Sequence, residues 1–159
     1  MSKRTGLQHE IGKRQPFDLL EQEAYLNLVR TASRLGVPFG RLFRELGLSE
    51  AGYNVLRILR GAGSPGRTCG EISAHVVAAV PDITRLIDRL EREGLAARRR
   101  TAEDRRQVVV TLTAKGKRTL AALDEPIREL HRRQLGHLKP SELRTLNALL
   151  VKARRPPAE

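Results

Sequence analysis

The chain has 159 residues, 40% of them hydrophobic and 30% charged, which suits one soluble domain with an oligomerisation appendage. It holds no apolar run near the roughly 18 residues of a membrane span, no signal-peptide pattern and a single cysteine, so we expect a cytoplasmic protein. With 30 Lys and Arg against 18 Asp and Glu, the net charge is +12. This charge favours a polyanionic partner, nucleic acid or an anionic membrane surface, over a merely arginine-rich protein.

The N-terminal third is predicted to be an arm followed by a long helix. Residues 1–15 are polar and unpatterned, and we expect a basic flexible arm there. Over residues 16–48 apolar side chains recur at three- and four-residue steps, which indicates a helix. Pro38 lies within this pattern, so a kink or break is expected before it.

The middle of the chain, residues 49–112, has the element order of a winged helix-turn-helix. One helix, which Ser49 can cap, ends at a glycine-rich segment. A short helix with a capping box of Thr68 and Glu71 then begins after Thr68. Pro81 is expected in the first turn of the next helix. Two strands follow, over residues 95–100 and 107–112, on either side of a charged loop.

Residues 113–155 return to a helical pattern, with a cap at Thr113 and a last helix that opens at Pro140. The apolar stripes of these two helices need partners, so residues 16–48 and 113–155 are predicted to form a dimerisation region. The predicted fold class is mainly α with a small β-wing: a winged helix-turn-helix flanked by N- and C-terminal dimerisation helices. A two-fold dimer implies a pseudo-palindromic DNA site with half-sites about 10 bp, or a multiple of this, apart.

The second helix of a helix-turn-helix enters the DNA major groove. Over residues 83–90 the apolar positions face the core and leave Thr84, Arg85 and Arg89 outward. The two arginines are one turn apart, and arginine binds guanine edges through two hydrogen bonds. Four acidic residues on or beside the same helix leave an alternative open, a surface helix with internal salt bridges.

The predicted wing is rich in arginine. A positively charged, narrow hairpin tip can enter an adjacent minor groove. If these arginines lay on a core face instead, they would be buried without partners. A solvated charged hairpin is the alternative. The wing arginines expected to bind double-stranded DNA are Arg98, Arg99, Arg105 and Arg106.

Several segments resemble the MarR family of transcriptional regulators over most of the chain. The wing segment Asp104–Thr113 fits the family pattern D-x-R-x5-L-T without a gap. Residues 82–91 resemble the family's recognition helix, and residues 53–59 resemble an earlier helix. The resemblance implies that Arg106 enters the minor groove and that Asp104 orients its guanidinium group.

The same resemblance implies the mode of action. It predicts a sequence-specific regulator, most often a repressor in this family, acting as a homodimer. Members commonly sense small aromatic or phenolic effectors, which makes such a molecule a further candidate partner. Ordinary core packing is the favoured interpretation for Phe39, Phe43 and Tyr53, and Arg30 is the other residue considered for a ligand cleft.

Other classes of function find little support in the sequence. There is no G-x-S-x-G, G-K-[ST], H-E-x-x-H or C-x-x-C motif, so neither an enzyme nor a cofactor is expected. The four histidines lack metal-ligand spacing, and an inert Cys69 is favoured over a redox sensor. The alternative function is a non-specific architectural or RNA-binding protein, although only 3% of residues are aromatic, few for base stacking.

Overall fold

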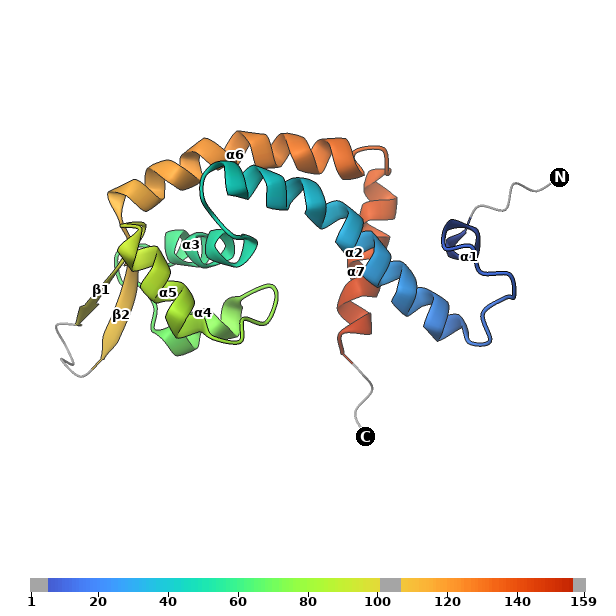
Figure 1. Ribbon diagram of the computed structural model, residues 1–159, viewed down its shortest axis with the longest axis horizontal. Helices are drawn as coiled ribbons and strands as arrows, with labels where there is room; N and C mark the ends of the chain where they lie inside the picture. The colour runs from blue at the N-terminus through green and yellow to red at the C-terminus, as the bar shows by residue number, and fades with distance from the viewer. Residues whose placement is uncertain (1–5, 101–106, 156–159) are drawn as a thin grey trace.

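The computed structural model describes residues 6–100 and 107–155 (Figure 1). These residues form seven helices and one two-stranded antiparallel sheet. In chain order the elements are α1 (Leu7–Glu10), α2 (Leu20–Glu45), α3 (Glu50–Ala62), α4 (Cys69–His75), α5 (Ile83–Arg92), β1 (Ala96–Arg100), β2 (Val108–Leu112), α6 (Ala114–Leu135) and α7 (Pro140–Ala153). The mainly helical fold with a β-wing is as predicted.

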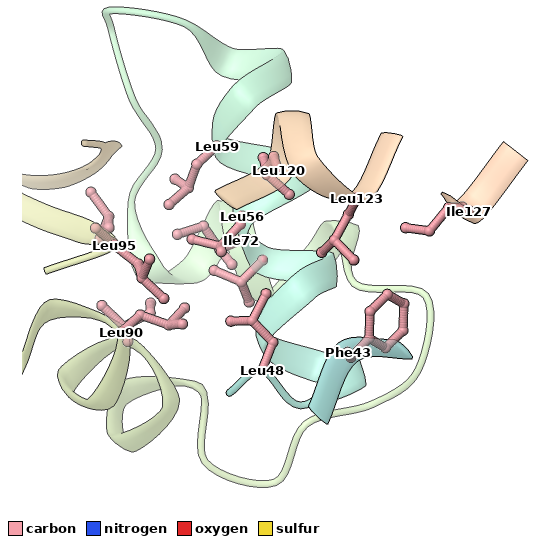
Figure 2. Packing of buried hydrophobic residues seen from close by; sticks show 14 residues of the cluster. Phe43, Leu48, Leu56, Leu59, Ile72, Leu90, Leu95, Leu120, Leu123 and Ile127 are labelled. Atoms are coloured by element: carbon pink, nitrogen blue, oxygen red, sulfur yellow. The ribbon is translucent and has the colours of Figure 1, made fainter. Parts of the chain in front are cut away.

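Helices α3, α4 and α5 and the sheet enclose the main hydrophobic core. Leu56 of α3, Ile72 of α4 and Ile87 of α5 are fully buried, and all belong to one cluster. Leu120 and Leu123 of α6 reach into the same cluster, so that α6 is anchored on the winged core (Figure 2). The burial of these leucine and isoleucine side chains is the main force that holds the core together, at about 25 cal/mol for each Å² of apolar surface.

The sheet is joined to the segment before α4 as well as to α5. Arg98 of β1 lies opposite Val110 of β2, and the backbone of Val110 exchanges two hydrogen bonds with Arg67, at 2.7 and 3.0 Å. Gly66 makes this close approach possible: its φ is +76°, and a Cβ atom there would lie 2.5 Å from the carbonyl oxygen of Val110.

Long helices connect the two ends of the molecule. Helices α2 and α6 pack together, and α7 lies at the end of α6 that is remote from the sheet (Figure 1). The 14-residue α7 has no buried residue, and α2 has only Phe43 buried. No helix in the described part of the chain has the length and apolar character needed to cross a membrane.

The predicted helix caps are confirmed. Ser49, Thr68 and Thr113 each accept a hydrogen bond from a backbone N–H three residues on, and Thr68 forms the predicted capping box with Glu71. These signals are local, since each cap and its partner lie within one helical turn.

Three expectations for the helices need correction. Of the kink or break expected before Pro38, the break is wrong, because helix α2 runs continuously through Pro38. In the preceding turn the side-chain amide of Gln134 donates to the Leu35 carbonyl at 2.8 Å. Packing against α6 thus supports the helix where proline weakens it. Pro81 is not in the first turn of α5, because Asp82 is the N-cap and accepts from the Arg85 N–H at 2.9 Å.

The third correction concerns the expected arm over residues 1–15. Within it, Leu7–Glu10 forms the short helix α1, and the Leu7 side chain is buried. The Glu10 carboxylate accepts a hydrogen bond from Arg30 of α2 at 2.7 Å. A single buried leucine and the ion pairs of one carboxylate are too small a signal to detect as a periodic pattern in the sequence.

Candidate nucleic-acid interface

Helix α5 presents a polar face opposite its buried side. Ile87 and Leu90 are buried in the core, and the helix N-terminus leaves Thr84 and Arg85 exposed. The Arg85 side chain is 88% exposed and lies 3.0 Å from the carboxylate of Asp82. Arg89, one turn further on, is exposed and donates to Glu93 at 2.8 Å. The three residues predicted to face the major groove therefore do lie on the outside of α5.

The acidic residues of this region, which left a surface helix with salt bridges as an alternative, have specific partners. Asp82 caps α5 and pairs with Arg85, and Glu93 pairs with Arg89. Asp88 and Glu91 both pair with Arg98 of β1, which is outside the helix. The carboxylates are thus each matched by an arginine, and Arg85 remains the most exposed of these arginines.

Arg98 was predicted to bind DNA, and in the structure its guanidinium lies against two carboxylates of α5. Its guanidinium lies 2.6 Å from Asp88 and 2.7 Å from Glu91, while its backbone N–H donates to the other Glu91 oxygen at 2.9 Å. These hydrogen bonds hold the pKa of Glu91 below its ordinary value, with the backbone donor as the largest cause. Only 26% of the Arg98 side chain is exposed. Its Nη1 and Nη2 atoms are both directed at carboxylates of α5.

Arg99 also contacts the protein. Its Nη2 atom donates to the carbonyl oxygens of Ser64 and Pro65, at 2.7 and 3.1 Å, in the loop between α3 and α4. Arg100, the last residue of β1, is exposed. Asp104, Arg105 and Arg106 lie outside the described residues, and their roles in DNA binding stay predictions.

A pocket of about 960 Å³ lies between the winged core and the long helices. An aromatic wall bounds it, with Phe43 stacked on Tyr53 at a centroid distance of 4.5 Å and Phe39 4.8 Å from His131. The pocket is lined from α2 by Phe39 and Phe43, from α3 by Glu50, Ala51, Tyr53, Asn54, Arg57 and Arg60, from the α4–α5 segment by Val77, Ala78, Ala79 and Val80, and from α6 by Asp124, Ile127, Arg128 and His131.

Polar groups at the pocket have defined partners. Arg57 donates to the Tyr53 hydroxyl at 3.2 Å, and its guanidinium lies 6.0 Å from the centre of that ring. Arg60 and Asp124 form a bidentate ion pair. Asn54 accepts from the Val77 N–H at 3.0 Å, which holds the segment that leads into α5.

Sequence reasoning missed most of this pocket. Core packing describes Phe43 correctly, since it is buried, but Phe43 and Tyr53 also form the pocket wall. Arg30, considered for a ligand cleft, instead binds Glu10 and does not line the pocket. The periodicity of a sequence does not predict which side chains of three helices and one loop line the same pocket. Among the described residues no group of three His, Cys, Asp or Glu side chains is arranged to hold a metal ion.

A helix-turn-helix with an exposed arginine on its second helix, followed by a two-stranded wing, defines a DNA-binding protein of the winged-helix class. A MarR family profile matches residues 48–108. The transcriptional repressor IacR of Pseudomonas putida is 29% identical over 123 residues, which span 77% of this chain and 72% of that protein.

Two solved structures extend the likeness to the helices outside the winged core. A MarR transcription factor from Planctomyces limnophilus is 46% identical, with a TM-score of 0.63 over 85% of this chain and 98% of that one. BpsR of Bordetella bronchiseptica, whose DNA binding is regulated by 6-hydroxynicotinic acid, is 25% identical, with a TM-score of 0.75 over 90% and 100% of the two chains. The chain belongs to the MarR family and is a DNA-binding transcriptional regulator.

Proposed function

We propose that this protein is a repressor that binds a pseudo-palindromic operator as a homodimer and is released by a small aromatic or phenolic effector. The observation that carries the DNA-binding part is the outward-facing Arg85 at the N-terminal end of α5, beside an arginine-rich wing. Regulation of transcription by DNA binding accounts for the exposed cationic side chains of α5 and the wing, so we propose neither enzymatic activity nor a cofactor. A cytoplasmic location follows from this function.

The division of the chain into regions is part of the proposal. Residues 49–112 would bind DNA, and residues 16–48 and 113–155 would form the dimer interface. The support is the exposed apolar surface of the end helices: Leu20 of α2 is 79% exposed and Leu149 of α7 is 58% exposed. Two amphipathic helices whose apolar faces lie in water need a cover, and a second copy offers an identical set of apolar faces.

The DNA contacts divide between two grooves. Thr84, Arg85 and Arg89 would lie at the major groove, with Arg85 as the principal reader of base edges because arginine matches the guanine acceptors. Arg105 and Arg106 would lie at the minor groove, with Asp104 orienting Arg106, as the resemblance of the wing motif implies. Arg98 and Arg99 are left out of this set, since their hydrogen bonds go to the protein.

The pocket between the core and the long helices is the proposed effector site. Its aromatic wall of Phe43 and Tyr53 suits a planar ring, and Arg57 offers a cation beside it for an acidic substituent. Regulation of BpsR by 6-hydroxynicotinic acid is the precedent among the relatives. The site has the volume that small ligands need and adjoins the segment before α5, so that a bound ligand touches the chain that sets the recognition helix.

The experiment is selection of bound DNA followed by titration. Random-sequence duplexes retained by the purified full-length chain are sequenced, and the recovered site is compared with a shuffled duplex at two salt concentrations. A specific regulator should prefer its site by about 10³ or more, and the site should show two-fold symmetry. Equal affinity for both duplexes would identify the alternative, a non-specific architectural protein, and tighter binding to single-stranded RNA would identify an RNA-binding protein.

A further inference from the structure

A carboxylate clamp joins the recognition helix to the wing. Asp88 and Glu91 lie one turn apart on α5, and both carboxylates bind the same guanidinium, that of Arg98 on β1. Glu91 also accepts from the Arg98 backbone N–H, so the contact holds the strand itself as well as the side chain. Since α5 and β1 are the two elements predicted to reach different grooves, the clamp sits where their relative orientation is set.

The arrangement of the sheet shows why one arginine serves the clamp and its neighbour does not. Successive residues of a strand point to opposite faces. Arg98 and the buried Ala96 share the face toward α5, whereas Arg99 points the other way and donates to Ser64 and Pro65. The base of the wing is therefore fixed from both sides, by α5 on one face and by the α3–α4 loop on the other.

The clamp also alters the charge of the DNA-facing helix. Asp88 and Glu91 would otherwise place two negative charges, three residues apart, on a helix that must approach phosphates. A planar guanidinium can satisfy two carboxylates at once through separate N–H groups, which a lysine ammonium does with less defined geometry. Arg98 thus compensates these charges within the protein.

We infer that Arg98 is a positioning residue, which sets the angle between recognition helix and wing so that both fit one duplex, and which does not bind phosphate. The inference rests on the proposed DNA-binding function. It distinguishes Arg98 from Arg105 and Arg106, although sequence alone places these wing arginines in one class.

Two substitutions, Arg98→Met and Asp88→Asn, test the inference. Asp88→Asn should change operator affinity in opposite directions if Arg98 positions the wing and if Arg98 binds phosphate. Arg98→Met should weaken operator binding by about tenfold or more, the size of one lost base contact. Binding to random duplex should fall by less, because only the compensation of the two carboxylates is lost there. The slope of log K against log salt should stay at the wild-type value, because no phosphate contact is lost. Arg100→Met, which removes the same charge two residues further along the strand, is the matched comparison.

Asp88→Asn removes a negative charge close to DNA. If Arg98 were a phosphate contact, this substitution would free it and tighten binding to operator and random duplex alike. The clamp predicts weaker operator binding instead, and it predicts that Asp88→Asn adds little once Arg98→Met is present. Thermal melting and the size of the oligomer, measured for each variant, establish that folding is intact; if Arg98→Met does not fold, Asp88→Asn alone decides.

The inference is overturned if Arg98→Met reduces affinity equally for both duplexes and lowers the salt slope by about one. Unchanged operator affinity of Arg98→Met, or tighter operator binding by Asp88→Asn, overturns it as well. Failure of the proposed function itself is a separate result, since the wild-type chain would then show no preference for any duplex.

Discussion

Arg60 of α3 and Asp124 of α6 are 64 residues apart in the sequence and form a bidentate ion pair, with N–O distances of 2.8 and 2.9 Å. The pair joins the winged core to the helix that leads to the predicted dimer interface, and both residues line the pocket. Hydrogen bonds from Arg60 are the main reason that the pKa of Asp124 lies below its ordinary value, and those to Asp124 raise the pKa of Arg60.

Asp124→Asn should therefore lower the free energy of unfolding at neutral pH by about 1 kcal/mol, as for a well-aligned but half-exposed pair. Because the folded-state pKa is lowered, the stabilisation is present above the unfolded-state pKa and is lost as the pH falls through the folded-state pKa. Urea denaturation at pH 7, and again well below about pH 3.9, measures the free energy of unfolding of wild type and variant at each pH. The difference between wild type and variant should shrink in acid.

Glu125→Gln is the control for this prediction. Glu125 pairs with Arg128 at 2.9 Å, but both side chains are largely exposed. An exposed pair of this kind contributes little, so the variant should stay close to wild type. An effect at neutral pH as large as that of Asp124→Asn would show that the Arg60–Asp124 geometry has no special importance.

Gly116→Ala should destabilise the fold by about 1–3 kcal/mol, the cost of overpacking. A Cβ atom at this position would overlap the Leu95 carbonyl oxygen and lie 2.6 Å from a Leu112 methyl carbon, at the junction of wing and α6. Gly61→Ala on α3 is the matched control, because open space surrounds that position and alanine favours the helix. Thermal melting should move the two variants in opposite directions, and a stable Gly116→Ala protein would contradict the packing of α6 on the wing.

Arg85→Ala should weaken operator binding by about 1–3 kcal/mol and relax the preference at one base position. Arg106→Ala should instead reduce the salt dependence and act through the minor groove, if the wing motif works as its family resemblance implies. Gel-shift titration against operators with single base changes separates the two. Unaltered base preference in Arg85→Ala would remove Arg85 from the role of base reader.

Asn54→Ala should loosen the segment that leads into α5, because the Val77 N–H loses its acceptor. We expect operator affinity of the free protein to fall several-fold, about 1 kcal/mol, and release by an aromatic acid to become less pronounced. Asn54→Asp keeps an acceptor oxygen at this position and serves as the comparison. Full effector response in Asn54→Ala would show that the pocket communicates with α5 by another route.

Leu149→Glu should convert the dimer to monomers and so reduce operator affinity. A charge on an apolar face that a second copy covers would be buried without a partner. Ala148→Glu places the same charge on the opposite side of α7 and should leave the dimer intact. Sedimentation of both variants at micromolar concentration tests the interface, and a dimeric Leu149→Glu protein would move the interface elsewhere.

Several features were determined by the sequence alone, because their causes are local. Caps at Ser49, Thr68 and Thr113 depend on hydrogen bonds within one turn. The order of helices and strands follows from apolar periodicity, and the exposure of Arg85 follows from the positions of Ile87 and Leu90. The resemblance to the MarR family is local as well, since it was carried by short segments such as Asp104–Thr113.

Only the tertiary structure decided which charges meet and which side chains share a cavity. Strand periodicity places Arg98 and Arg99 on opposite faces, but it does not identify the carboxylates of α5 that bind Arg98. Nor does it identify the carbonyls, about 35 residues away, that accept from Arg99. The pocket likewise brings Phe43, Arg57 and Val77 together from separate elements. The physical reason is that ion pairs and cavities depend on distances between elements, which are set only when the common core packs.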